Sequence, residues 1–147
     1  MSDPTLYLFD GHNLLHAGRF DGQDELIDTL ASFVAGRGAR GVVVFDGGGN
    51  ERRVGPLTVT YAPHADDLLE RLAAEYRAEE SVCLVSSDAL IRGVSGQEVR
   101  TLSSRLFLAE LQPERHRELE QRGAGGRVGD RLDAKMRDRL ERLRRGE

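Results

Sequence analysis

The sequence predicts an α/β protein in which helices cover both faces of a mainly parallel β-sheet. The chain has 147 residues, enough for one domain of ordinary size. Short, mostly apolar runs alternate along it with stretches in which apolar residues recur at helical spacing. Because strands that alternate with helices form right-handed β-α-β units, this order favours three layers, α-β-α.

The first half of the chain is expected to supply three strands and two helices. The run at 5–9 is apolar and β-prone, and the glycines between 36 and 41 end the helix before them. The expected strands are 5–9, 42–45 and 57–61, and the expected helices lie around 26–34 and 68–76.

The second half is expected to continue the pattern and to end in a charged tail. The strands are 81–85 and 99–101, a short helix lies near 89–94, and a longer one spans 104–111 with Ser103 as its cap. Residues 113–129 are rich in Arg, Glu and Gly and predict a connector. A last helix is capped by Asp130 and carries an apolar stripe of Leu132, Met136, Leu140 and Leu143.

Charge is distributed unevenly along the chain. Residues 1–112 carry 10 basic and 17 acidic side chains, whereas residues 113–147 carry 11 and 8. Of the 21 basic residues only Lys135 is a lysine, and arginine suits bidentate contacts with phosphate. Acidic residues are interleaved with the tail arginines, so ion pairs on a solvated helix face explain the tail as well as RNA contact does.

No apolar run approaches the length of a membrane span, and no signal-type segment follows Met1, so a cytoplasmic protein is expected. The lone cysteine, Cys83, lies in an apolar run and is expected to be a buried structural thiol.

Aspartates follow three of the expected strands, at Asp10, Asp46 and Asp88. The carboxyl ends of parallel strands share one edge of a sheet, so these side chains are expected to converge there. A further pair, Asp66 and Asp67, begins the second helix. Carboxylates gathered in this way repel one another unless a divalent cation binds. Oxygen ligands without cysteine or clustered histidine favour Mg²⁺ or Mn²⁺, which can activate a water for phosphodiester hydrolysis.

Other chemistries of such sheets lack their motifs in this chain. The first strand is followed by DGHNLL instead of G-x-G-x-x-G, and there is neither a P-loop nor a G-x-S-x-G elbow. A haloacid dehalogenase would need an acid where His12 stands, and a receiver domain would need a lysine after a late strand.

Four segments together resemble a known family. These segments are LYLFDGHNLL, VVVFDGGG, ADDLLERLAAEY and VCLVSSDALIRGVSGQEVRTLSSRLFLAEL. Through them, residues 5–112 are similar to the YacP-like NYN domain, a branch of the PIN-like ribonucleases. The tail RLDAKMRDRLERLRRG is also similar to that branch. The resemblance implies a PIN-like nuclease domain over 1–112, with 113–147 as an Arg-rich connector and a C-terminal helix that is part of this domain or appended to it.

The same resemblance implies a set of site residues. Asp10, one acid of the A-D-D motif and Asp88 would hold one or two Mg²⁺ or Mn²⁺ ions for RNA hydrolysis, with Asn13 and Asp46 in support. We favour Asp66 within the A-D-D motif because Glu70 falls on its helix face, which leaves Asp67 as a cap or supporting group.

Flanking residues have two interpretations each. Ser86 and Ser87 would bond to phosphate or a metal-bound water, or would serve as turn and capping groups. His12 would contact substrate or act as a proton shuttle, at a position where the family often has an aromatic residue. Arg92 and Arg105 would bind the RNA backbone, or would be ordinary surface arginines.

The expected function is therefore a metal-dependent endoribonuclease. The alternatives are an inactive RNA- or ribosome-binding module of the same fold and a metal-dependent phosphatase of a small substrate. The expected partner is RNA, with mRNA on the ribosome and delivery by a protein partner both open, and no membrane. The oligomeric state is left open.

Overall fold

A computed structural model of the chain describes residues 3–93, 99–111 and 130–146. It contains one six-stranded sheet in the order β3-β4-β2-β1-β5-β6, in which only β3 runs antiparallel to its neighbour. The strands are β1 (Leu6–Asp10), β2 (Arg40–Asp46), β3 (Arg52–Val54), β4 (Leu57–Ala62), β5 (Val82–Ser86) and β6 (Arg100–Ser103). The helices are α1 (Gly11–Ala17), α2 (Gln23–Gly36), α3 (Ala65–Tyr76), α4 (Asp88–Gly93) and α6 (Asp130–Arg144), and residues 104–111 are also helical.

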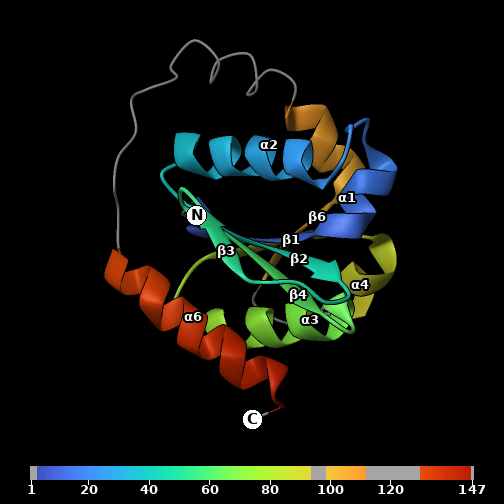
Figure 1. Cartoon of the computed structure of the whole chain (residues 1–147). Coiled ribbons are helices and arrows are strands. Elements are labelled where there is room, and N and C mark those ends of the chain that lie inside the picture. Colours follow the sequence, from blue (N-terminus) through green and yellow to red (C-terminus); the bar gives the residue numbers. More distant parts are fainter. Residues whose placement is uncertain (1–2, 94–98, 112–129, 147) are drawn as a thin grey trace.

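The two faces of the sheet are both buried, which confirms the expected α/β class. Figure 1 shows α1 and α2 on one side of the sheet and α3 and α6 on the other. Side chains alternate along β1 accordingly: Leu6 and Leu8 pack in the cluster of α3 and α6, and Tyr7 and Phe9 pack in the cluster of α2. Strands buried on both faces require the continuous apolar runs that the sequence contains.

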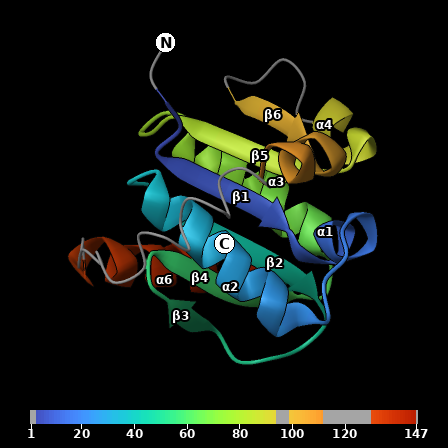
Figure 2. The same ribbon diagram turned by 90° about the horizontal axis from the view of Figure 1, so that it is seen from above.

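The strand order places the first strand at the centre. β1 pairs with β2 on one side and with β5 on the other, and the view from above in Figure 2 shows these three strands side by side. Their carboxyl ends therefore meet at one edge, where Asp10 and Asp46 end β1 and β2 and Asp88 follows β5.

Two elements were not expected from the sequence, α1 and β3. Helix α1 begins with Gly-His-Asn, three residues of low helix propensity, and forms because Asp10 caps it. β3 is a three-residue edge strand whose Arg52 and Arg53 are exposed, and charge of this kind protects a sheet edge from pairing with other chains.

Gly11 is required where it stands. A Cβ atom at this position would overlap the ring of Phe45, so α1 can lie against the end of β2 only without a side chain there. This close approach brings the first turn of α1 to the acid-bearing edge.

Helix α6 packs on α3 as part of the core. Met136, Leu140 and Leu143 are buried in the same cluster as Leu69 and Leu72 of α3. The expected stripe is thus confirmed for these three residues. The side chains of Asp130 and Leu132 and the expected connector at 113–129 lie outside the described part of the chain.

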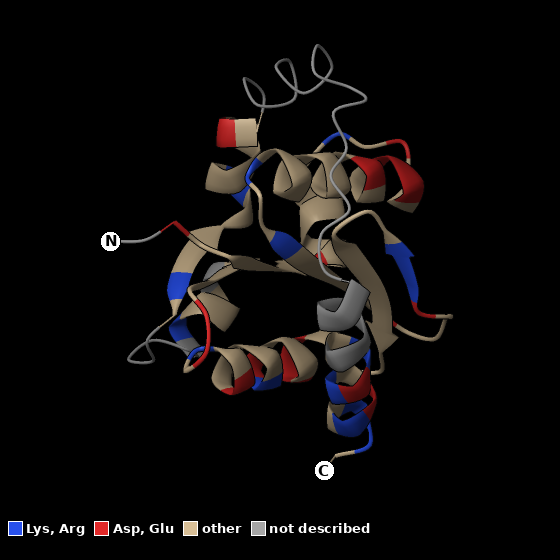
Figure 3. Cartoon of the chain, turned by 90° about the vertical axis from the view of Figure 1, so that its left-hand side faces the viewer, with Lys and Arg blue, Asp and Glu red and all other residues tan. Residues whose placement is uncertain are grey.

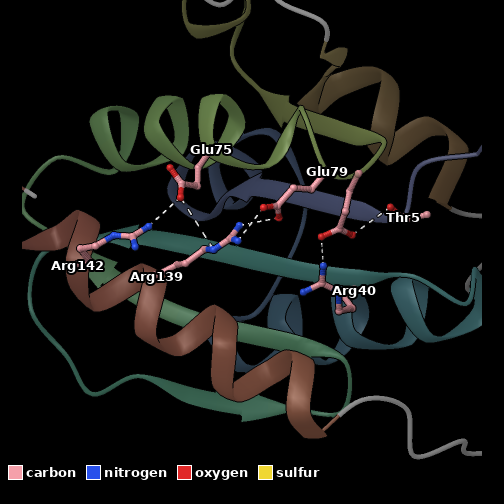
Figure 4. Close-up of polar contacts among 7 residues, drawn as sticks. Thr5, Arg40, Glu75, Glu79, Arg139 and Arg142 are labelled. Carbon is pink, nitrogen blue, oxygen red and sulfur yellow. Dashed lines mark hydrogen bonds and ion pairs between the residues drawn. The ribbon is translucent and has the colours of Figure 1, made fainter.

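Ion pairs between helices surround this apolar contact (Figure 4). Arg139 donates two hydrogen bonds of 2.8 Å to Glu79 and lies over the ring of Tyr76, with its Cζ 4.7 Å from the ring centroid. Arg142 donates to Glu75 at 2.7 Å. Arg139 and Arg142 of α6 therefore pair with Glu75 at the end of α3 and with Glu79 just beyond it.

Charged residues are concentrated on the outer elements. Figure 3 shows them on α3 and α6, whereas most of the central sheet is uncharged. Cys83 is buried on β5, as expected, and burial raises the pKa of its thiol to about 12. No helix in the described ranges is both long and apolar enough to cross a bilayer.

Replacing Leu140 by Ala is expected to lower the free energy of unfolding by about 2–5 kcal/mol, the usual cost of a large cavity in a core. Urea denaturation measures this loss. The matched control is Asp138→Ala on the exposed face of the same helix, which should change stability by no more than about 0.5 kcal/mol. Equal effects of the two substitutions would show that α6 does not pack on the domain.

Candidate active site at the carboxyl edge of the sheet

Asp10 is a buried carboxylate at the end of the central strand, only 7% exposed. Its Oδ1 accepts a hydrogen bond from the backbone N–H of Asn13 at 3.3 Å, and its Oδ2 accepts one from the hydroxyl of Ser86 at 3.0 Å. The first bond caps α1 and the second joins β1 to β5. Both oxygens are thus held by hydrogen bonds within the protein.

The pKa of Asp10 is raised, first because burial removes water from the charged form. The hydrogen bonds from Asn13 and Ser86 oppose this effect, and the negative charges of Asp66 and Asp46 add to it. Asp66 and Asp46 are thus electrostatic neighbours of Asp10. Asp66 and Asp67 are both exposed in the first turn of α3.

Asp46 connects three elements at this edge. Its Oδ1 accepts a hydrogen bond from the backbone N–H of Ala65 at 2.8 Å, which places the start of α3, and hence Asp66, beside the ends of β1 and β2. Its own N–H donates to Nδ1 of His12 at 3.2 Å. The same His12 nitrogen lies 3.5 Å from Oδ2 of Asp46. Because Nδ1 accepts the backbone bond, the neutral ring carries its proton on Nε2.

Asn13 is held from two sides. Its backbone N–H bonds to Asp10, and its side-chain Oδ1 accepts a hydrogen bond of 2.5 Å from the hydroxyl of Ser104. Ser104 follows β6 and is 3% exposed. This residue was not expected from the sequence, although the rule that drew attention to the other strand ends applies equally to the end of β6.

The β5 side supplies the remaining expected residues. The hydroxyl of Ser87 accepts a hydrogen bond from Leu90 N–H at 3.3 Å and so caps α4, one of its two expected roles. Asp88 is the first residue of α4, and its side chain lies outside the described part. Arg92 and Arg105 are exposed on α4 and on the helix at 104–111.

The carboxylate oxygens at this edge are the kind of ligand that a hard divalent cation prefers. The buried Asp10 with Asp66 nearby offers carboxylate oxygens, the ligands that Mg²⁺ and Mn²⁺ prefer. Among the described side chains, no three His, Cys, Asp or Glu groups are arranged to hold a metal. The third acid of the expected set is Asp88, whose side chain is not one of those described.

The acids lie beyond the central strands of a three-layer α/β fold, where such sheets hold their sites, and the family match assigns the fold to the nuclease type. The sequence profile of the YacP-like NYN domain matches residues 8–145, which include α6. The chain belongs to this family, as the resemblance in its motifs indicated.

Solved structures agree with this placement. The chain is similar to the crystal structure of Rae1 (YacP) from Bacillus subtilis in a single-residue mutant form, with a TM-score of 0.64 and 26% identity over 82% of this chain and 86% of that chain. A second crystal structure of Rae1 (YacP) from Bacillus subtilis has a TM-score of 0.63 and 23% identity, covering 96% of this chain and 95% of that one, and shows the same fold. No curated protein sequence matches the chain significantly.

The raised pKa of Asp10 predicts a pH-dependent effect of Asp10→Asn on stability. A carboxyl whose folded-state pKa lies above its unfolded value binds more protons when folded, so its ionisation destabilises the fold as pH rises through that interval. Asn keeps the capping oxygen and removes the charge. Urea denaturation in EDTA should therefore find the variant more stable at pH 7, by roughly 0.5–2 kcal/mol.

This gain should shrink as pH falls toward 3, because the wild-type carboxyl is then protonated as well. A variant that is less stable than wild type at pH 7 would contradict this expectation, because it would show that the charged form of Asp10 stabilises the fold.

Proposed function

We propose that the protein is a cytoplasmic Mg²⁺- or Mn²⁺-dependent endoribonuclease that hydrolyses RNA phosphodiester bonds. The observation that carries the proposal is the buried carboxylate of Asp10, which has Asp66 and Asp46 as electrostatic neighbours at the carboxyl edge of a nuclease-type sheet. A site that only binds a polyanion gains nothing from gathered negative charge, whereas a cation site requires it. Membership of the YacP-like NYN domain family supports the same conclusion.

Each residue has a proposed role. Asp10, Asp66 and Asp88 would hold the cation, which when bound neutralises charge on the phosphodiester and lowers the pKa of a water. Asp10 suits this role because its two hydrogen bonds fix both oxygens before any ligand arrives. Asp46 supports the site by placing the start of α3. Ser87 supports it by capping α4, which begins at Asp88.

The RNA contacts would come from exposed groups around the edge. His12 is partly exposed and, with Nδ1 occupied by a backbone N–H, presents Nε2–H as a donor to the substrate. Arg92 and Arg105 are the arginines proposed to bind the RNA backbone. The substrate class is RNA, taken free, on the ribosome or from a protein partner.

Wild-type protein is expected to cleave a long mixed-sequence RNA in Mn²⁺ or Mg²⁺ and to leave it intact in EDTA. Asp88→Asn should lower the cleavage rate by at least about 100-fold, because removing one ligand weakens both cation binding and charge neutralisation. Gel electrophoresis of internally labelled RNA measures both effects and separates endonucleolytic fragments from mononucleotides. Cleavage in EDTA, or a fully active Asp88→Asn, would refute the proposed mechanism.

Adjacent acids of α3 provide a matched comparison. Asp66→Asn is expected to lower the cleavage rate by about 100-fold or more, whereas Asp67→Asn should retain it within a few-fold, because Asp66 is an electrostatic neighbour of Asp10 and shares its helix face with Glu70. Both substitutions change the same charge in the same helix turn. The reverse ranking would make Asp67 the ligand of the A-D-D motif.

A further inference from the structure

Ser104 makes a buried contact that the helix bearing it does not need. The helix at 104–111 is already capped, since the hydroxyl of Ser103 accepts a hydrogen bond from Leu106 N–H at 3.2 Å. The hydroxyl of Ser104 instead donates to Oδ1 of Asn13, at 2.5 Å and across 91 residues of sequence. This hydrogen bond runs from the helix toward the edge of the sheet where Asp10 lies.

The position of this hydroxyl is fixed by the core. Phe107, three residues further along the same helix, is fully buried and packs on Phe9 of β1 and on Phe33 of α2, with centroid distances of 5.4 and 4.9 Å. The helix that carries Ser104 is thus anchored to the same strand that ends at Asp10. A donor held in this way can orient its partner with little freedom.

This contact fixes the orientation of the side-chain amide of Asn13. Its Oδ1 is occupied by Ser104, and its backbone N–H is occupied by Asp10. Within the described residues, the two N–H donors of its Nδ2 have no hydrogen-bond partner. Asn13 is partly exposed, so these donors can reach a ligand beside Asp10.

We propose that Ser104 is a positioning residue that fixes the Asn13 amide so that Nδ2 donates to a non-bridging phosphate oxygen of the RNA substrate. This inference rests on the proposed ribonuclease function. Asn13 would contact the substrate directly, and Ser104 would act only through Asn13. Without the Ser104 hydroxyl, the amide is free to rotate, and the donor is correctly aimed for only part of the time.

Steady-state cleavage kinetics in Mn²⁺ test the proposal with three single variants. Ser104→Ala is expected to lower kcat by about 10- to 100-fold, the usual effect of losing an orienting partner, with KM changed by less than about threefold. Ser104→Thr keeps the hydroxyl and should restore kcat to within a few-fold of wild type. The matched control is Ser103→Ala, which removes the neighbouring cap and should lower the melting temperature without lowering kcat.

A double-mutant cycle then separates positioning from general damage. In an Asn13→Ala background, Ser104→Ala should cause no further loss of kcat, because the group through which it acts is gone. The side-chain amide resonances of Asn13 in a ¹⁵N-correlated NMR spectrum give a readout without catalysis. They should shift in Ser104→Ala and stay near their wild-type positions in Ser104→Thr.

The outcomes distinguish the two claims. An active wild type with a fully active Ser104→Ala overturns the positioning role and leaves the ribonuclease proposal standing. Independent, multiplicative losses in the double mutant, or unchanged Asn13 amide resonances in Ser104→Ala, also overturn it. A folded wild type that leaves RNA intact in Mn²⁺ refutes the proposed function, and the role in substrate binding falls with it.

Discussion

The organisation of the candidate site depends on one carboxylate, that of Asp10. It lies at the end of the central strand, so burial opposes its charge, and the neighbouring acids oppose it further. Its two hydrogen bonds cap α1 and join β1 to β5. The same side chain therefore closes the first turn of a helix and has a raised pKa. A bound cation would relieve that unfavourable ionisation, which links the local stability of the fold to the proposed chemistry.

A second layer of contacts holds the acids in relation to one another. Asp46 accepts a hydrogen bond from the N–H of Ala65, and its own N–H donates to His12. The ends of β2, α1 and α3 are therefore connected through one residue. Gly11 permits this arrangement because α1 must lie against Phe45. On the other side, Ser104 reaches Asn13 from the end of β6. Contacts from β2, β5 and β6 therefore converge on the first turn of α1.

The described arginines of the C-terminal helix form ion pairs within the fold. In α6, Arg139 pairs with Glu79, just after α3, and Arg142 pairs with Glu75 of α3, while Arg137 and Arg144 both pair with Glu51. These pairs, together with the buried side chains of Leu140 and its neighbours, hold α6 against α3 and against the segment at Glu51. The family match extends through the same helix. The proposed RNA contacts are assigned to Arg92 and Arg105.

Much of the fold and part of the site could be predicted from sequence, for separate physical reasons. Buried parallel strands need uninterrupted apolar runs, and the acids that follow them must share an edge, so the sequence pattern alone is enough to place Asp10 and Asp46 together. Helix periodicity on α3 also favoured Asp66, the acid that acts on Asp10. Helix α1 could not be predicted, because it depends on a cap and on contact with Phe45 instead of on helix propensity. The Ser104 bond and the α6 ion pairs join residues far apart in sequence, which no local pattern encodes.

Titration calorimetry of Mn²⁺ into the metal-free protein at pH 7 would show whether Asp10 forms a cation site at this edge of the sheet. We expect saturable binding by wild type, loss of that binding in Asp10→Asn, and retention in Asp67→Asn, since Asp10 is a proposed ligand and Asp67 is not. Binding that is equally tight in Asp10→Asn, or no binding by folded wild type, would contradict the assignment of a cation site to Asp10.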